Sequence, residues 1–131
     1  MSGFSIATSR ALPDIELGQL EKRLETVEEI ASATMLPLIV DVDTGGEPVA
    51  CQHFCARLEA LGVSAVVIED KVFPKRSSLA ASVSHNLEDL EVFVAKIAAT
   101  KRAIQSPDFM IIARTEALIA GAGMAEAVRR A

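Results

Sequence analysis

Three short runs of apolar, mostly β-branched residues stop abruptly at charged residues, and this pattern limits the chain to few folds. The runs span residues 37–43, 64–69 and 109–114. Runs of this length and composition are typical of parallel strands that are buried on both faces. We therefore expect three buried parallel strands that deliver charged side chains to one edge of a sheet.

Helical patterns lie between these runs. Apolar residues recur every three or four positions over about 14–34, 48–61 and 90–105, and a further helical pattern starts at Met124. In the first of these helices we expect the charged residues, Arg23 among them, to lie largely on the exposed face. The alternation of strand and helix predicts right-handed crossovers and a parallel sheet. We also expect the end of an earlier strand at 4–8.

The bulk properties predict one globular domain over residues 1–131 and exclude several classes of protein. The net charge is −5 and the Lys and Arg residues are scattered, so the sequence lacks the basic patch that is typical of nucleic-acid-binding proteins. No apolar run approaches the ~20 residues that span a bilayer, and no secretory signal is visible. Cys51 and Cys55 lie four apart on one predicted helix, which is poor disulfide geometry. We expect a cytoplasmic protein that binds neither nucleic acid nor a membrane.

Carboxylates gather at the ends of the predicted strands. Asp41 and Asp43 are two positions apart in one run, so we expect them to point the same way. Converging carboxylates repel unless a cation lies between them, and Mg²⁺ prefers such oxygen ligands. Asp is also common at strand ends and in turns, so both interpretations of this pair stand. Glu69 ends the next predicted strand and so favours the metal interpretation. Asp14 is a fourth candidate carboxylate for this site.

One arginine and one long loop complete the predicted site. Arg114 ends the third run and suits a carboxylate or phosphate, or a salt bridge to Glu69 or Glu116. Residues 70–86 lack periodicity, which is typical of a lid or binding loop. Its lysines, Lys71 and Lys75, either cover an anionic substrate or stay solvated, and Ser77 supplies a hydroxyl.

His53 lies between the two cysteines and suggests a metal ligand. Residues 51 and 53 point to different faces of a helix, so we expect His53 to pack or to face solvent.

Three segments together resemble a known family. They are 41–46, the string E-D-K-x-F-P-K-x-x-S-L at 69–79, and 112–117. These motifs resemble the phosphoenolpyruvate mutase/isocitrate lyase superfamily, and most closely its branch of phosphoenolpyruvate mutases and phosphonopyruvate hydrolases. The resemblance extends from about Ser5 to Ala131, and the long string is highly specific.

The resemblance implies a (β/α)₈ barrel with its site at the carboxyl ends of the strands. It implies that Asp41 binds Mg²⁺ directly, and that Asp14, Asp43 and Glu69 hold its water shell. The chemistry implied is transfer of a phosphoryl group between the enolate oxygen of phosphoenolpyruvate and its carbon. In this interpretation the lid excludes water, and the residues that contact the substrate are Arg114, Lys75 and Ser77.

Three departures from the family pattern qualify this expectation. The mutases usually carry Asn at the position of Ser77, so hydrolysis of phosphonopyruvate or oxaloacetate stays an alternative. Carbon–carbon lyases carry a lid cysteine, and neither Cys51 nor Cys55 is on the loop. The family barrel is about twice as long, so we expect a truncated barrel that associates as a homo-oligomer. The alternative of another class is a half-barrel that is inactive unless it pairs with another chain.

Overall fold

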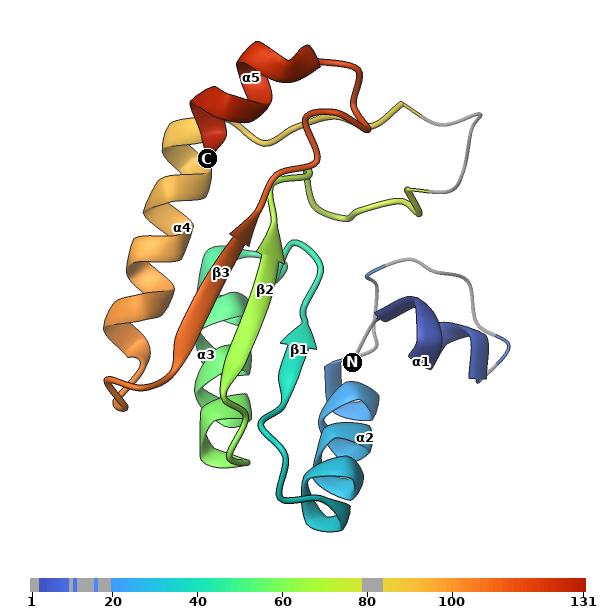
Figure 1. The fold of residues 1–131 in the computed structure, drawn as a ribbon, viewed down its shortest axis with the longest axis vertical. Coiled ribbons are helices and arrows are strands. Elements are labelled where there is room, and N and C mark those ends of the chain that lie inside the picture. The colour runs from blue at the N-terminus through green and yellow to red at the C-terminus, as the bar shows by residue number, and fades with distance from the viewer. Residues whose placement is uncertain (1–2, 10, 12–15, 17–19, 79–83) are drawn as a thin grey trace.

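The structure is a computed structural model, and it describes residues 3–9, 11, 16, 20–78 and 84–131. Figure 1 shows a small parallel sheet with helices packed beside it and a long loop at the carboxyl ends of the strands. The elements in chain order are α1 (Gly3–Ser9), α2 (Leu20–Ala33), β1 (Ile39–Asp41), α3 (Pro48–Ala60), β2 (Ala65–Glu69), α4 (Leu90–Ala103), β3 (Met110–Arg114) and α5 (Gly123–Arg130).

The three predicted strands form one parallel sheet in the order β1-β2-β3. The α/β prediction is therefore confirmed. β1 is shorter than the predicted 37–43, because the backbone turns after Asp41 and Asp43 adopts φ 57°. The prediction of three buried strands holds only for the central β2. Ile39 on β1 is 51% exposed and Met110 on β3 is 58% exposed, because β1 and β3 each pair with one neighbour among the described strands.

The N-terminal segment is a helix, so the predicted strand end at 4–8 is wrong. α1 spans Gly3–Ser9, and the Ser9 hydroxyl donates to the carbonyl of Ile6 at 2.9 Å. Both Ile6 and Ala7 are buried. A short apolar run is compatible with either a strand or a helix turn, and periodicity alone does not separate the two.

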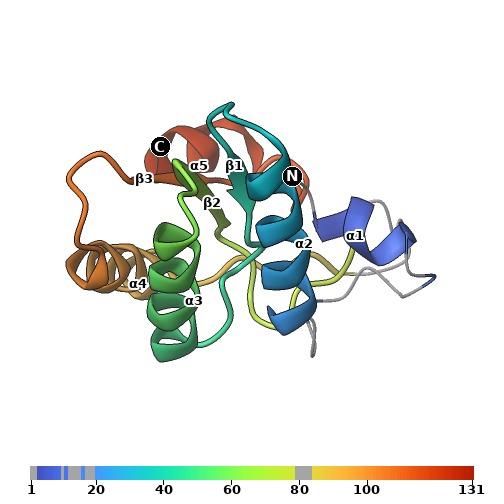
Figure 2. The same ribbon diagram turned by 90° about the horizontal axis from the view of Figure 1, so that it is seen from below.

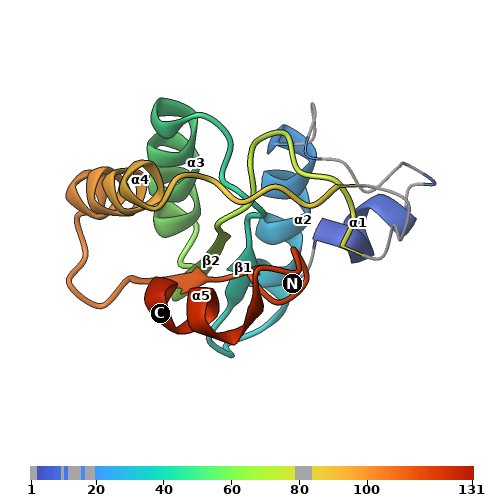
Figure 3. The same ribbon diagram turned by 90° about the horizontal axis from the view of Figure 1, so that it is seen from above.

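Helices α2, α3 and α4 lie along one face of the sheet, as Figures 2 and 3 show from opposite ends. The core forms where this helical layer meets β1 and β2. Its largest members include Phe54, Leu58, Ile68 and Phe93. α5 lies near the carboxyl ends of the strands (Figure 1). The burial of one face by helices explains why the strand sequences are apolar and the loops after them are polar.

Two helix boundaries have local causes in the residue types at those positions. Asp89 caps α4, because its carboxylate accepts hydrogen bonds from the amides of Glu91 and Val92 at 2.9 and 3.2 Å. Gly62 follows α3 and adopts φ 82°, a conformation that glycine adopts without strain. α2 begins at Leu20 in the described chain. The candidate Asp14 lies outside the described residues.

The loop between β2 and α4 returns to its own starting point. Lys71 and Leu87 form an antiparallel bridge, and the amide of Val72 donates to the carbonyl of Asn86 at 3.0 Å. The amide of Glu88 donates to the carbonyl of Asp70 at 2.8 Å. The loop therefore has a closed base at the edge of the sheet where Glu69 ends β2.

The turn after β1 supplies a sharp test of packing. Gly45 has φ +75°, and a Cβ added there would lie 2.5 Å from the Sγ of buried Cys51. We expect Gly45→Ala to lower the free energy of unfolding by about 3 kcal/mol, from backbone strain plus this clash. Urea unfolding measures the change.

The control is Gly62→Ala. Gly62 has φ +82°, and an added Cβ there meets no atom within 4 Å. It should therefore cost only the backbone term, about 1 kcal/mol. Equal losses for the two variants would contradict the packing of Cys51 against this turn.

Candidate active site

The last residues of the three strands meet at the carboxyl edge of the sheet. Asp41, Glu69 and Arg114 end β1, β2 and β3, and Glu69 is paired in register with Arg114. The Arg114 Nη1 atom lies 3.4 Å from an Asp41 oxygen and 3.7 Å from a Glu69 oxygen. The predicted gathering of these residues is therefore confirmed. The guanidinium offsets the mutual repulsion of the two carboxylates.

The shortest contacts of Arg114 are to Glu116. Its Nη2 lies 2.5 Å, and its Nε 2.8 Å, from the same Glu116 oxygen. The salt-bridge interpretation of Arg114 is thus correct for both predicted partners. Its side chain is 37% exposed, so part of the guanidinium still faces solvent at the rim. A group held in this way can also receive an anion from solvent.

Lys71 is buried and belongs to the same network. Its Nζ lies 3.1 Å from a Glu116 oxygen and also bonds the Ser78 hydroxyl, which in turn donates to Glu116 at 2.8 Å. Burial opposes the charge of Glu116, but the bonds from Ser78, Lys71 and Arg114 outweigh it and hold its pKa below the ordinary value. Lys71 is therefore not a solvated loop charge: it anchors the loop to the segment after β3. The alternative that it also covers an anionic substrate stays a prediction.

Asp43 does not lie on β1, so the prediction that it points with Asp41 along one strand is wrong. It sits in the following turn, where its amide donates to the Asp41 carboxylate at 3.0 Å. Its own carboxylate is buried and pairs with Arg23 of α2 and with Lys75 of the loop. The Lys75 Nζ is 2.7 Å from Asp43, so Lys75 is also not a solvated loop charge.

Sequence reasoning missed one basic and one acidic residue near Asp43. We expected Arg23 on the exposed face of its helix, yet it is buried. It lies three residues after Leu20 and four before Val27, so the helical period itself places it on the apolar stripe. Glu16 is buried as well, and it accepts bonds from the Thr44 hydroxyl at 2.7 Å and the Gly46 amide at 3.0 Å. No periodic pattern marks that residue.

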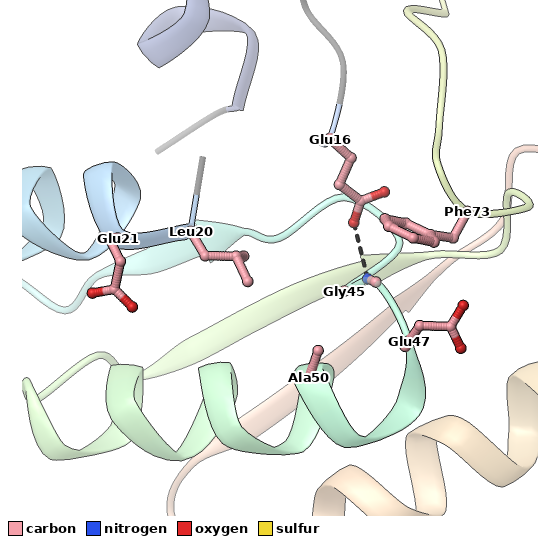
Figure 4. A pocket seen from close by; sticks show the side chains of 8 residues that line it. Glu16, Leu20, Glu21, Gly45, Glu47, Ala50 and Phe73 are labelled. Atoms are coloured by element: carbon pink, nitrogen blue, oxygen red, sulfur yellow. Dashed lines mark hydrogen bonds between the residues drawn. The ribbon is translucent and has the colours of Figure 1, made fainter. Parts of the chain in front are cut away.

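A cavity of about 410 Å³ lies beside the Asp43 turn. Figure 4 shows the Glu16 carboxylate reaching the turn, with the ring of Phe73 next to it and Ala50 of α3 below. Burial and the nearby Asp43 raise the pKa of Glu16 despite its hydrogen bonds. Phe73 belongs to the predicted lid, so the loop forms one wall of this cavity.

Glu69 is a buried carboxylate with an unsatisfied oxygen. It is 1% exposed, and its Oε1 atom has no hydrogen-bond partner. Burial raises its pKa to about 7, although Lys75 and Lys71 oppose the shift. A buried carboxylate oxygen without a partner is a candidate ligand for a cation.

The donor set fits Mg²⁺. Within the ranges that the structure describes, no three His, Cys, Asp or Glu side chains form a preassembled metal cluster. Mg²⁺ commonly binds through one or two carboxylates and keeps several waters. The half-buried Asp41 and the partnerless Glu69 oxygen provide hard donors of this kind. Ser77 is half-buried on the loop.

Comparison with known proteins identifies the family. The family model for phosphoenolpyruvate phosphomutase matches residues 1–131. The chain belongs to this family. It is 46% identical to phosphonopyruvate hydrolase from a Variovorax species, over 98% of this chain and 45% of the relative. The family resemblance read from the motifs is thereby confirmed.

Solved structures agree with this assignment. A phosphoenolpyruvate phosphomutase from Streptomyces platensis superposes with a TM-score of 0.93 at 42% identity, covering 98% of this chain and 45% of that one. A phosphonopyruvate hydrolase in complex with oxalate and Mg²⁺ superposes with a TM-score of 0.87 at 45% identity, covering 98% and 44%. The family members have TIM-type barrels, and this chain spans about 45% of their length.

Named members of the superfamily include mutases, a hydrolase and 2-methylisocitrate lyases, so the family is one of enzymes.

The structure also bears on the expectations for the cysteines, for His53 and for membrane-spanning segments. Cys51 and Cys55 are buried free thiols, and His53 is exposed. In the described part of the chain, no helix is long and apolar enough to cross a membrane.

The raised pKa of Glu69 predicts a pH dependence of stability. Below pH 4.5 the carboxyl is protonated in both states, and between 4.5 and about 7 the folded state holds the proton more tightly. Stability contributed by this group is therefore lost as pH rises, by up to about 3 kcal/mol. In Glu69→Gln this loss should disappear. Urea unfolding from pH 5 to 8 measures it, and identical pH profiles for the two proteins would contradict the assignment.

Proposed function

We propose that this chain contributes the metal-binding and lid segments of a Mg²⁺-dependent enzyme that makes or breaks the phosphorus–carbon bond of phosphonopyruvate. The first candidate is the mutase reaction, in which the phosphoryl group moves between that carbon and the enolate oxygen of phosphoenolpyruvate. The observation that carries the proposal is the convergence of Asp41, Glu69 and Arg114 at adjacent strand ends in a chain of this family.

The proposed roles follow from the surroundings of each residue. Asp41 and the partnerless oxygen of Glu69 would hold Mg²⁺, directly or through water. When bound, the ion supplies positive charge for a developing enolate oxygen. Arg114 would bind the phosphoryl or carboxylate group with its exposed edge. Asp43 would support the water shell, and its pairing with Lys75 would hold the loop near the site.

Exclusion of water is the proposed task of the loop. A phosphoryl group in transit has loose, metaphosphate-like character, and any water within reach competes for it. The first part of this loop is tied to the sheet edge through Lys71 and Lys75. These ties support the proposed lid. Asp14 stays a predicted contributor to the metal site.

A second candidate is the hydrolysis of phosphonopyruvate, which Ser77 and the 46% identical hydrolase favour. A serine hydroxyl in place of the family's asparagine would hold the phosphoryl group differently and admit water. The two reactions use the same metal and the same substrate. They differ in the acceptor of the phosphoryl group.

Phosphorus NMR distinguishes the candidates. Phosphonopyruvate is incubated with the chain and Mg²⁺, and a new phosphoenolpyruvate signal indicates the mutase whereas inorganic phosphate indicates the hydrolase. An unchanged spectrum from a folded sample would contradict activity of this chain. Light scattering of the same sample tests the predicted homo-oligomer, since a monomer at all concentrations would contradict it.

The metal assignment predicts a loss of Mg²⁺ affinity in Asp41→Asn. Removing one negative ligand should weaken binding about tenfold or more, as measured by titration calorimetry. The matched control is Asp108→Asn, which changes an exposed aspartate that precedes β3 at the opposite end of the strand. Equal affinities for the two variants would remove Asp41 from the metal site.

The lid assignment predicts that Ser77→Asn shifts the products toward phosphoenolpyruvate. The amide would replace the hydroxyl that admits water, so the ratio of phosphoenolpyruvate to inorganic phosphate in the NMR spectrum should rise several-fold. Ser84→Asn, at an exposed position of the same loop, is the control. A product ratio unaffected by Ser77→Asn would contradict the role given to this hydroxyl.

A further inference from the structure

Helix α4 carries a buried lysine that the roles above do not use. Lys96 lies in the middle of the helix and is 3% exposed. Burying an ammonium group costs considerable free energy unless polar partners replace its water. The partners of Lys96 therefore indicate what the residue holds together.

Its Nζ atom contacts two segments that are far from each other in the sequence. It donates to the carbonyl oxygen of Thr44 at 3.3 Å, and it lies 3.6 Å from a carboxylate oxygen of Glu88. Thr44 directly follows Asp43 in the turn after β1. Glu88 lies just beyond the proposed lid and closes its base, because its amide donates to the carbonyl of Asp70. One side chain thus joins the Asp43 turn to the end of the lid.

The two segments also border a common cavity. A space of about 250 Å³ is lined by Gly46 and Glu47 of the turn, by Val72 and Phe73 of the loop, and by Glu88 and Lys96. Lys96 and Glu88 both line this space, so their ion pair lies at its wall, between the turn and the loop.

We propose that Lys96 is a positioning residue that couples the turn carrying Asp43 to the closing segment of the lid. Its importance for turnover rests on the proposed function, whereas the coupling itself is a property of the fold. With Lys96 in place, a movement of the Asp43 turn at the metal site is transmitted to Glu88 at the base of the lid. Without it, the turn and Glu88 lose this direct link, and the remaining ties are the Lys75–Asp43 ion pair and the hydrogen bond from the Glu69 amide to the Asp43 carbonyl.

Hydrogen exchange tests the coupling in the whole chain. The variant is Lys96→Met, and its matched control is Lys101→Met on the same helix. Lys101 also donates to a carbonyl, that of Phe109 at 2.8 Å, but at the opposite end of β3. Lys96→Met should speed exchange of the Gly45, Gly46 and Glu88 amides about tenfold. Lys101→Met should leave all three within about twofold.

A second variant separates coupling from a general loss of stability. Glu88→Gln keeps the shape of the side chain but weakens its attraction for Lys96. It should speed exchange of Gly45 and Gly46, since its carboxylate acts on the turn through Lys96. No change at those glycines would overturn the proposal. An equal increase at every amide in Lys96→Met would also overturn it.

Mg²⁺ provides the readout that a merely structural lysine would not alter. In the unsubstituted chain the ion should slow exchange at both the turn and Glu88, and in Lys96→Met at the turn only. Slowing at both places in Lys96→Met would overturn the coupling. If Mg²⁺ slows neither segment in the unsubstituted chain, the proposed metal site fails. The comparison of variants without metal still decides the role of Lys96.

Discussion

The guanidinium of Arg114 holds the carboxyl edge of this sheet together. It lies among the carboxylates of Asp41, Glu69 and Glu116, which would repel one another without it. Because β1, β2 and β3 run parallel and adjacent, all of these side chains reach the same edge. Arg114, with Lys71 at Glu116, therefore allows three acidic groups to stand close together. A bound metal ion would compete with these cations for the same oxygens.

A separate ion-pair network surrounds Asp43. Arg23 from α2 and Lys75 from the loop both pair with its buried carboxylate. Lys71 anchors the start of the loop to Glu116, and Lys96 reaches Glu88 at its end. The loop is thus held to the sheet edge by buried charges at several points. Breaking any one pair would leave an uncompensated charge, so these contacts favour one defined position of the loop.

Prediction from the sequence succeeded where a local pattern is repeated along the chain. The apolar runs gave β2 and β3 to within a residue, and the helical pattern over 90–105 began where α4 begins. It failed where the pattern is too short or a turn intervenes. The segment at 4–8 formed a helix instead of a strand, and Asp43 left β1 with a left-handed backbone. The predicted roles in metal and substrate binding stay predictions.

The sequence by itself determined the order of strands and helices, the charged strand ends and the family, because periodicity and motif spacing are encoded locally. Only the tertiary structure decided which charges pair. Lys71 and Lys75 look like solvated loop residues in the sequence, yet both are buried against carboxylates from other segments. Whether a charged side chain meets water or a partner depends on residues far away in the chain, and no local pattern carries that information.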